Sequence, residues 1–172
     1  MRIEDFIHAI PDYPKPGIVF RDITPLLANG EAFRETINTF LARYQNQGIT
    51  KIVGIEARGF IFATALAYAM GVGFVPLRKP GKLPRSTVSQ SYALEYGEDK
   101  LELHAEDVTA ADKVLIMDDL LATGGTVLAA VEMLQKLNVS IVECAFVIQL
   151  DDLPGAKRLQ NANIPYYTLC SF

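Results

Sequence analysis

The hydrophobic residues of this chain alternate between helical spacing and short continuous runs. Apolar side chains three and four positions apart predict helices, at residues 31–45, 60–70 and 126–137. Apolar runs with turn residues on either side predict buried strands, at residues 51–55, 74–77, 114–117, 141–149 and 166–169. Because strands and helices alternate without an internal repeat, we expect an α/β fold, with a mainly parallel, twisted sheet and helices on both faces.

Two stretches need a separate interpretation. Residues 86–96 and 99–104 predict two strands joined through Gly97, and the alternation of apolar and polar residues in the second indicates one exposed face. Residues 59–77 are uncharged and mostly apolar, and they are nearly as long as the ~20 residues of a membrane-spanning helix. Glycines and a proline divide this stretch, so we expect a buried helix that stops at Gly71 and then a strand, with no membrane span.

Composition and charge narrow the class of protein. The 172 residues fit one domain of roughly 100–200 residues, and the formal net charge of −4 argues against a general nucleic-acid-binding surface, which needs many Lys and Arg. The two cysteines, Cys144 and Cys170, are too few for a disulfide framework, so we expect buried, reduced thiols. The first residues lack the basic and then apolar order of a secretion signal, which favours a cytoplasmic protein.

The segment from Val114 to Thr126 carries the strongest chemical signal. Its apolar run ends in two carboxylates, Asp118 and Asp119, and these are followed by a loop of small residues, Ala122, Thr123, Gly124, Gly125 and Thr126. Glycines let the backbone turn its amide N–H groups inward, threonine hydroxyls add donors, and the positive end of the following helix dipole faces the same point. We therefore expect a phosphate-binding loop beside carboxylates that suit the vicinal hydroxyls of a ribose or the water shell of a metal ion.

The aspartates and the loop have other interpretations when each is taken alone. A pair of aspartates at the end of a strand also occurs in phospho-acceptor receiver domains and in the magnesium-binding strands of nucleoside triphosphatases. The loop alone fits a simple turn, but a turn does not require threonines on both sides of two glycines. The combination of both features favours a ligand that contains a ribose and a phosphate.

Two further segments are expected at the same edge of the sheet, because the carboxyl ends of parallel strands meet there. Residues 56–60 follow a predicted strand and place Ala57 and Arg58 at its end. Residues 78–85 hold four positive charges on a loop broken by Gly and Pro, among them Arg78, Lys79 and Lys82. A surface arginine and a solvated basic loop are the simpler interpretations, whereas a multiply charged diphosphate gives a reason to gather these cations.

Together these segments resemble the adenine phosphoribosyltransferases, a group within the type I phosphoribosyltransferases. Residues 118–126 resemble the signature that binds 5-phosphoribosyl 1-diphosphate. Residues 14–25 resemble the base-binding hood, and residues 94–97 resemble the acidic motif of the mobile loop. Residues 153–159 resemble a C-terminal segment of the family, whose role the sequence does not indicate.

The resemblance implies the type I phosphoribosyltransferase fold, as a single domain over residues 1–172. A small N-terminal hood is expected at about residues 1–35, and a flexible catalytic loop with a β-hairpin at about residues 78–104. The implied reaction belongs to purine salvage: ribose 5-phosphate passes from 5-phosphoribosyl 1-diphosphate to adenine, giving AMP and diphosphate. The family also implies a homodimer and a non-proline cis peptide bond between Ala57 and Arg58.

The expected site residues follow from the same resemblance. Glu95 is the expected proton carrier and, with Arg58, the expected catalytic pair. Mg²⁺ is the expected cofactor, held by the diphosphate and the ribose, with Asp118 or Asp119 as a further ligand through water. Adenine is expected at Val19, Phe20 and Arg21, where the ring of Phe20 offers a stacking face worth ~1–3 kcal/mol. The other contacts to 5-phosphoribosyl diphosphate or AMP are expected from Ala57, Arg78, Lys79, Lys82, Tyr96 and residues 122–126.

Two alternatives stay open at this point. A phosphoribosyltransferase for another base would keep residues 118–126 and differ around Phe20 and residues 94–97. A regulator that senses the same ligand without turnover would need a DNA-reading module. Few residues precede residue 14 to form such a module, and the negative net charge of the chain is unfavourable for binding DNA.

Overall fold

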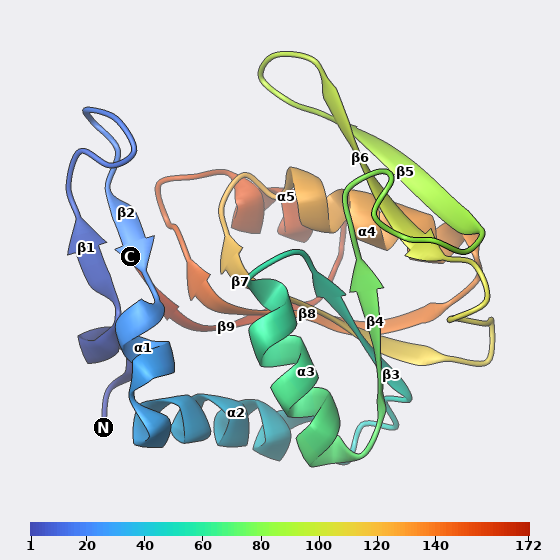
Figure 1. Ribbon diagram of the computed structural model, residues 1–172, viewed down its shortest axis with the longest axis horizontal. Helices are drawn as coiled ribbons and strands as arrows, with labels where there is room; N and C mark the ends of the chain where they lie inside the picture. Colours follow the sequence, from blue (N-terminus) through green and yellow to red (C-terminus); the bar gives the residue numbers. More distant parts are fainter. The chain divides into compact units, whose positions relative to one another are not determined.

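The computed structural model describes residues 1–172, which divide into two compact units, Met1–Ala42 and Arg43–Phe172. The larger unit is built on a five-stranded parallel sheet with the order β4-β3-β7-β8-β9 (Figure 1). Its strands are β3 (Lys51–Ile55), β4 (Gly73–Leu77), β7 (Lys113–Leu121), β8 (Ser140–Gln149) and β9 (Tyr166–Ser171). The expected α/β class with a mainly parallel sheet is confirmed.

Helices α3 (Gly59–Met70) and α4 (Gly125–Lys136) cover opposite faces of this sheet. The step from β3 to β4 across α3 and the step from β7 to β8 across α4 move along the sheet in opposite directions. Since such crossovers are right-handed, the two helices lie on different faces. The strand order therefore reverses between β3 and β7, and ligands of open α/β sheets bind at such a reversal.

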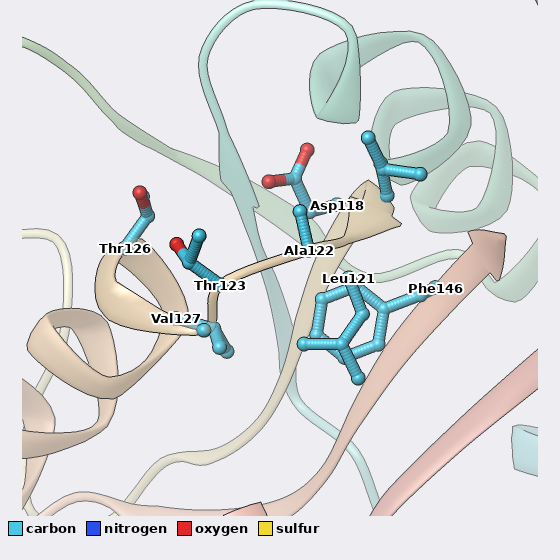
Figure 2. A pocket seen from close by; sticks show the side chains of 9 residues that line it. Asp118, Leu121, Ala122, Thr123, Thr126, Val127 and Phe146 are labelled. Carbon is cyan, nitrogen blue, oxygen red and sulfur yellow. The ribbon is translucent and has the colours of Figure 1, made fainter. Parts of the chain in front are cut away.

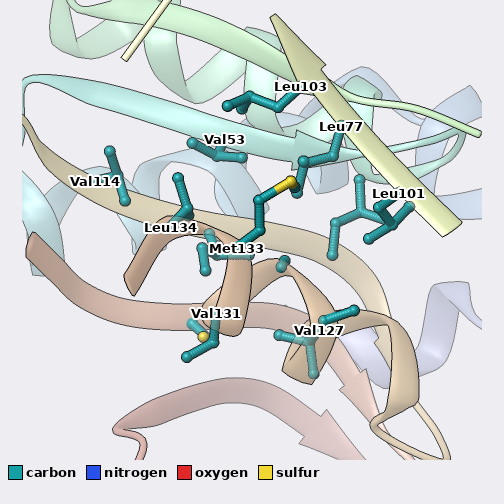
Figure 3. Packing of buried hydrophobic residues seen from close by; sticks show 14 of the residues in the cluster. Val53, Leu77, Leu101, Leu103, Val114, Val127, Val131, Met133 and Leu134 are labelled. Carbon is teal, nitrogen blue, oxygen red and sulfur yellow. The ribbon is translucent and has the colours of Figure 1, made fainter. Parts of the chain in front are cut away.

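Figure 3 shows the core between α4 and the sheet. It contains the buried side chains of Val53, Leu77, Val114, Val127, Val131, Met133 and Leu134. The same core includes Leu101 and Leu103 of β6 (Glu98–His104), and both are fully buried. The predicted alternation in this strand is confirmed, because its leucines enter the core while Lys100 before them is exposed and Glu102 between them is only partly buried.

The hairpin of β5 (Thr87–Ala93) and β6 is antiparallel and turns through Gly97, as the sequence predicts. The N–H of Leu94 donates to the Gly97 carbonyl at 2.9 Å, and Gly97 has a φ of +91°. This left-handed conformation favours glycine because it has no Cβ. β5 is shorter than the predicted residues 86–96, since residues 94–97 form the turn.

The ends of α3 and β7 test two boundary predictions. α3 ends at Gly71, which has a φ of 69° and donates its N–H to the carbonyls of the last turn, as predicted. No helix of the protein has the length and hydropathy needed to cross a lipid bilayer. The prediction that β7 ends before Asp118 is wrong, because β7 stays paired with β8 as far as Leu121. Pairing with the neighbouring strand, rather than the apolar run, sets the length of β7.

The smaller unit holds short elements that hydrophobic periodicity does not predict. A 3-10 helix (Ile3–Phe6) precedes the antiparallel strands β1 (His8–Ile10) and β2 (Phe20–Asp22), and α1 (Thr24–Ala28) follows them. In the larger unit α5 (Gly155–Asn161) is missed for the same reason, since one or two turns show no reliable period. The longer α2 (Gly30–Tyr44), which begins in the smaller unit, agrees with its prediction within one residue at each end.

The substitution Leu134→Ala is expected to lower the free energy of unfolding by about 2–5 kcal/mol, because it leaves a cavity where this side chain is fully buried. Chemical unfolding followed by circular dichroism measures the loss. The matched control is Gln135→Ala at the exposed neighbouring position of α4, for which we expect a change within about 0.5 kcal/mol. Equal effects of the two substitutions would contradict the assigned core.

Candidate active site

The candidate site begins where β3 and β7 end, at the reversal of strand order. Ala57 and Arg58 follow β3 after Glu56, and Asp118 and Asp119 lie near the end of β7. The Nε atom of Arg58 is 2.9 Å from Oδ2 of Asp119. The structure therefore brings together two of the segments that the sequence analysis assigned to one site. The carboxylate of Asp119 is buried, whereas the Arg58 side chain is 44% exposed and reaches it from the solvent side.

Asp118 lies in surroundings that oppose its negative charge. Burial raises the pKa of Asp118 well above its usual range, and the charge and side-chain hydrogen bond of Asp119 raise this pKa further. The positive charge of Arg58 and the N–H of Asp119, which donates to Asp118 Oδ1 at 2.8 Å, act in the opposite direction. A strongly perturbed carboxyl group in such a position is typical of a functional site.

The helix α3 begins against these carboxylates with a glycine. A Cβ atom on Gly59 would lie 2.9 Å from Asp118 Oδ1 and 3.0 Å from the Met117 carbonyl oxygen, which is closer than ordinary contacts allow. Glycine at position 59 thus lets the N-terminus of α3 approach the acid pair. The positive end of the helix dipole stabilises negative charge at that place.

The loop after β7 borders a small cavity of about 70 Å³ next to Asp118 (Figure 2). Figure 2 shows the hydroxyls of Thr123 and Thr126 on the loop and on the first turn of α4. Gly124 has a φ of +85°, and Gly125 is the first residue of α4. The structure thus contains the predicted combination of a glycine turn, two hydroxyls and a helix N-terminus beside a carboxylate. Among the lining residues are Asp118, Ala122, Thr123, Gly124 and Thr126.

The start of α5 supports this loop, although the sequence indicates no role for residues 153–159. The N–H of Gly155 donates to the Ala122 carbonyl at 2.9 Å, and Nη1 of Arg158 donates to the Thr123 carbonyl at 2.8 Å. A Cβ atom on Gly155 would lie 2.4 Å from the Ala122 carbonyl oxygen, so this approach requires glycine. The contacting residues are too far apart in the sequence for any local pattern to reveal them.

Glu56 organises the basic segment after β4, and the sequence analysis missed this role. The Nε of Arg78 lies 3.1 Å from Oε1 of Glu56, the N–H of Lys79 donates to the same oxygen at 2.9 Å, and Lys82 binds the other oxygen. Burial favours a higher pKa for Glu56, but the hydrogen bonds from these three residues lower it below its usual value. Glu56 therefore stays ionised and holds the cations next to the end of β3.

A larger cavity of about 470 Å³ connects the hairpin with the loop. The structure brings Glu95, the expected proton carrier, into the lining of the same cavity as the expected phosphate-binding threonines. The cation of Lys79 contacts Asp99 and the Tyr92 hydroxyl there. Tyr96, in contrast, is 87% exposed and lines neither cavity. The lining includes Lys79, Tyr92, Glu95, Thr123, Gly125, Thr126 and Arg158.

The expected cis peptide bond lies one residue earlier than predicted. It joins Glu56 and Ala57, so the prediction at Ala57–Arg58 is wrong. The N–H of Glu56 still donates to the Leu77 carbonyl at 3.0 Å. Pairing with β4 thus continues to this N–H group, and the chain turns directly after it.

The residues expected to bind adenine lie in the smaller unit. Phe20 and Arg21 are on β2, and Val19 comes directly before this strand. The ring of Phe20 packs edge-on against Tyr13, with 5.2 Å between the ring centroids. Val19 is 48% exposed, and neither Val19 nor Arg21 lines the cavity beside Phe20. This cavity of about 270 Å³ is lined by Ile10, Tyr13, Phe20, Asp22 and Thr24.

Comparisons of the sequence agree with this geometry. A family model described as "Phosphoribosyl transferase domain" matches residues 24–166. The adenine phosphoribosyltransferase of Idiomarina loihiensis is 59% identical over 170 residues, which cover 99% of this chain and 96% of the relative. The adenine phosphoribosyltransferase of Shewanella frigidimarina is 55% identical over 170 residues, which cover 99% of this chain and 93% of the relative.

Solved structures of adenine phosphoribosyltransferases also match this chain. Adenine phosphoribosyltransferase from Rhodothermus marinus matches with a TM-score of 0.92 and 46% identity, over 99% of this chain and 96% of that one. The enzyme from Saccharomyces cerevisiae, solved with D-2,5-dideoxy-2,5-imino-altritol 1,6-bisphosphate and adenine, matches with a TM-score of 0.90 and 39% identity, over 97% and 96%. The fold and the site define the class of type I phosphoribosyltransferases. Within this class, the chain belongs to the adenine phosphoribosyltransferase family.

The substitution Asp118→Asn is expected to change stability, relative to the wild type, more favourably at pH 8 than at pH 4. The folded protein binds the Asp118 proton more tightly than the unfolded chain, whose aspartates titrate at about pH 4. The contribution of this proton to stability is therefore complete below about pH 4 and is lost as the pH rises towards the folded pKa. Asparagine carries no charge, so the melting temperature of the variant minus that of the wild type should be more positive at pH 8.

The matched control is Asp152→Asn, at an exposed position after β8. We expect this control to follow the wild type at both pH values. A difference between Asp118→Asn and the wild type that stays constant with pH, or that turns against the variant at pH 8, would contradict the assigned surroundings of Asp118.

Proposed function

We propose that this protein is a purine salvage enzyme that transfers ribose 5-phosphate from 5-phosphoribosyl 1-diphosphate to adenine, giving AMP and diphosphate. One observation carries the proposal: the acid pair Asp118 and Asp119 leads directly into a glycine and threonine loop at the N-terminus of α4. A phosphate at the loop and a ribose along the carboxylates fit this order of groups. The family to which the chain belongs supports the same reaction.

The loop is proposed to hold the 5-phosphate. Backbone N–H groups of residues 122–126 and the hydroxyls of Thr123 and Thr126 are suitable donors for phosphate oxygens, and the dipole of α4 adds positive potential. Fixing the phosphate at one end of the ribose orients the reacting carbon at the other end. Such orientation lowers the entropic part of the barrier.

Asp118 and Asp119 are proposed to bind the ribose hydroxyls. In the reaction, the bond from C1 of the ribose to the diphosphate oxygen breaks, and a bond from C1 to N9 of adenine forms. The sugar passes through an oxocarbenium-like state, so negative groups near the ring stabilise it. Asp119 keeps its place through the ion pair with Arg58.

Arg58, Arg78, Lys79 and Lys82 are proposed to bind the diphosphate, with the backbone of Ala57 beside them. Each of these four cations already contacts a carboxylate: Asp119, Glu56 or Asp99. When the diphosphate binds, its oxygens either replace these carboxylates as partners of the cations or bind the cations together with them. This arrangement holds long, flexible side chains near the positions in which they meet the leaving group.

Mg²⁺ is the proposed cofactor. Residues 1–172 contain no group of three or more His, Cys, Asp or Glu side chains arranged to hold a metal ion. The pair Asp118 and Asp119 instead fits the usual binding of Mg²⁺ through one or two carboxylates, waters and substrate phosphates. When bound, Mg²⁺ neutralises the charge that develops on the leaving diphosphate.

Glu95 is proposed to accept the proton that N9 of adenine loses. A carboxylate within reach of a reacting nitrogen acts as a general base, and the place of Glu95 in the larger cavity supports this role. Tyr96 next to it is proposed to close over the substrate when the hairpin moves. Closure excludes the water that would otherwise hydrolyse the activated sugar.

Val19, Phe20 and Arg21 are proposed to bind adenine. The ring of Phe20 beside its cavity supports stacking with a purine. Backbone groups around Phe20 are proposed to select the exocyclic amine of adenine over a keto oxygen. A mismatch would leave buried polar atoms unpaired, which discriminates strongly.

We propose that residues 1–172 act as a single domain, with the hood at about residues 1–35 and the mobile loop at about 78–104. A homodimer is proposed because the uncharged helix α3 leaves Ile61 and Tyr68 exposed, and exposed apolar side chains on one helix favour an interface. The cytoplasm is the proposed compartment, and the two buried cysteines, which form no disulfide, suit its reducing conditions.

The proposed function predicts which base is used. The protein is incubated with 5-phosphoribosyl 1-diphosphate, Mg²⁺ and one of adenine, hypoxanthine, guanine, xanthine or uracil, and nucleotide formation is measured by chromatography. We expect AMP from adenine and little product from the other bases. Turnover with hypoxanthine or guanine but not with adenine would refute the substrate. Binding without turnover of any base would favour a ligand-sensing regulator.

The substitution Glu95→Gln is expected to lower kcat by about 10²–10⁴-fold, because the amide cannot accept the proton. The melting temperature should stay within a few degrees of the wild type, since Glu95 is exposed. Glu98→Gln is the matched control, at another exposed position of the same hairpin, with kcat expected to be unchanged. Equal kcat values for the two variants would remove Glu95 from the mechanism.

A further inference from the structure

Arg158 on α5 lies beside the loop and is absent from the residues that the sequence analysis assigned to the site. Its Nη1 donates to the Thr123 carbonyl at 2.8 Å, and it lines the larger cavity with Thr126. The same nitrogen lies 3.9 Å from the place where a Cβ atom on Gly125 would be. The guanidinium is therefore next to the first residue of α4.

The charge of Arg158 is not balanced by an acid. The other cation that lines the larger cavity, Lys79, pairs with Asp99, and Arg58 pairs with Asp119. No carboxylate of the protein lies within ion-pair distance of Arg158, whose hydrogen-bond partner is a neutral carbonyl. Its positive charge therefore faces a cavity, which Glu95 also lines, without being neutralised in an ion pair.

Arg158 also fixes the direction of one peptide group of the loop. In a trans peptide the carbonyl of one residue and the N–H of the next point in opposite directions. Arg158 binds the Thr123 carbonyl and Gly155 binds the Ala122 carbonyl, so α5 holds two successive carbonyls. The N–H groups of Thr123 and Gly124 therefore both point away from α5. Successive N–H groups with one direction form a site for an anion.

We propose that Arg158 is a positioning residue for the 5-phosphate: it orients the loop N–H groups through the Thr123 carbonyl, and it supplies a positive charge without an ion pair next to the first residue of α4. The proposal rests on the proposed function, because it assigns the phosphate of that reaction to the loop. It gives residues 153–159 a role in binding as well as in folding.

The test compares AMP, which carries the 5-phosphate, with adenosine, which lacks it. In the full-length protein, Arg158→Gln keeps a hydrogen-bond donor but removes the charge, and Arg158→Met removes both. We expect AMP binding by calorimetry to weaken about tenfold in Arg158→Gln and more in Arg158→Met. The affinity for adenosine should stay within about twofold of the wild type. Arg158→Lys should recover part of the AMP affinity, because it restores the charge.

The dependence of AMP affinity on salt concentration distinguishes an electrostatic role of Arg158 from a purely structural one. AMP affinity of the wild type should fall more steeply with ionic strength than that of Arg158→Gln, because one screened attraction is lost in the variant. The matched control is Lys157→Gln, which removes the neighbouring exposed charge of α5. We expect this control to keep the AMP affinity of the wild type.

Two results would overturn the role of Arg158. One is AMP affinity within about twofold of the wild type in all Arg158 variants, and the other is an equal loss of AMP and adenosine affinity, which indicates a purely structural effect. Either result, found while the wild type converts adenine to AMP, leaves the proposed function intact. A wild type that neither forms AMP nor binds it would refute the proposed function itself.

Discussion

Two adjacent carboxylates near the end of a central strand set the constraint that the rest of the site satisfies. Burial and the neighbouring charge of Asp119 disfavour the negative charge of Asp118, as the raised pKa of Asp118 indicates. Arg58 offsets part of this effect, and the glycine at position 59 lets the N-terminus of α3 come close. Groups that oppose folding stability are retained where binding or catalysis needs them. We propose that the acid pair is such a feature, with the ribose hydroxyls as its ligands.

Both halves of the site are held in position before a ligand binds. On the side proposed to bind the diphosphate, Glu56 holds Arg78 and Lys82, so two long cationic side chains are already oriented. On the side proposed to bind the 5-phosphate, Gly155 and Arg158 hold two carbonyls of the loop. Ordering these groups in advance reduces the entropy lost on binding.

The sequence predicts those parts of the molecule that are determined by residues close together in the chain. The strand at residues 51–55 and the helix stop at Gly71 follow from short patterns. The glycine turn and the helix start at residues 122–126, where we propose that phosphate binds, are predicted because their signals lie in consecutive residues. Contacts between distant residues leave no such pattern: the cations around Glu56 and the approach of Gly155 to the loop appear only in the fold. The short strands β1 and β2 and the end of β7 at Leu121 are not predicted, because strand pairing, not local composition, determines them.

The most direct measurement is a crystal structure of the protein with AMP bound. We expect the 5-phosphate oxygens to accept hydrogen bonds from the backbone N–H groups and hydroxyls of residues 122–126, with the ribose hydroxyls at Asp118 and Asp119. A phosphate bound at any other place, with this loop empty and the ribose away from the acid pair, would contradict the central claim.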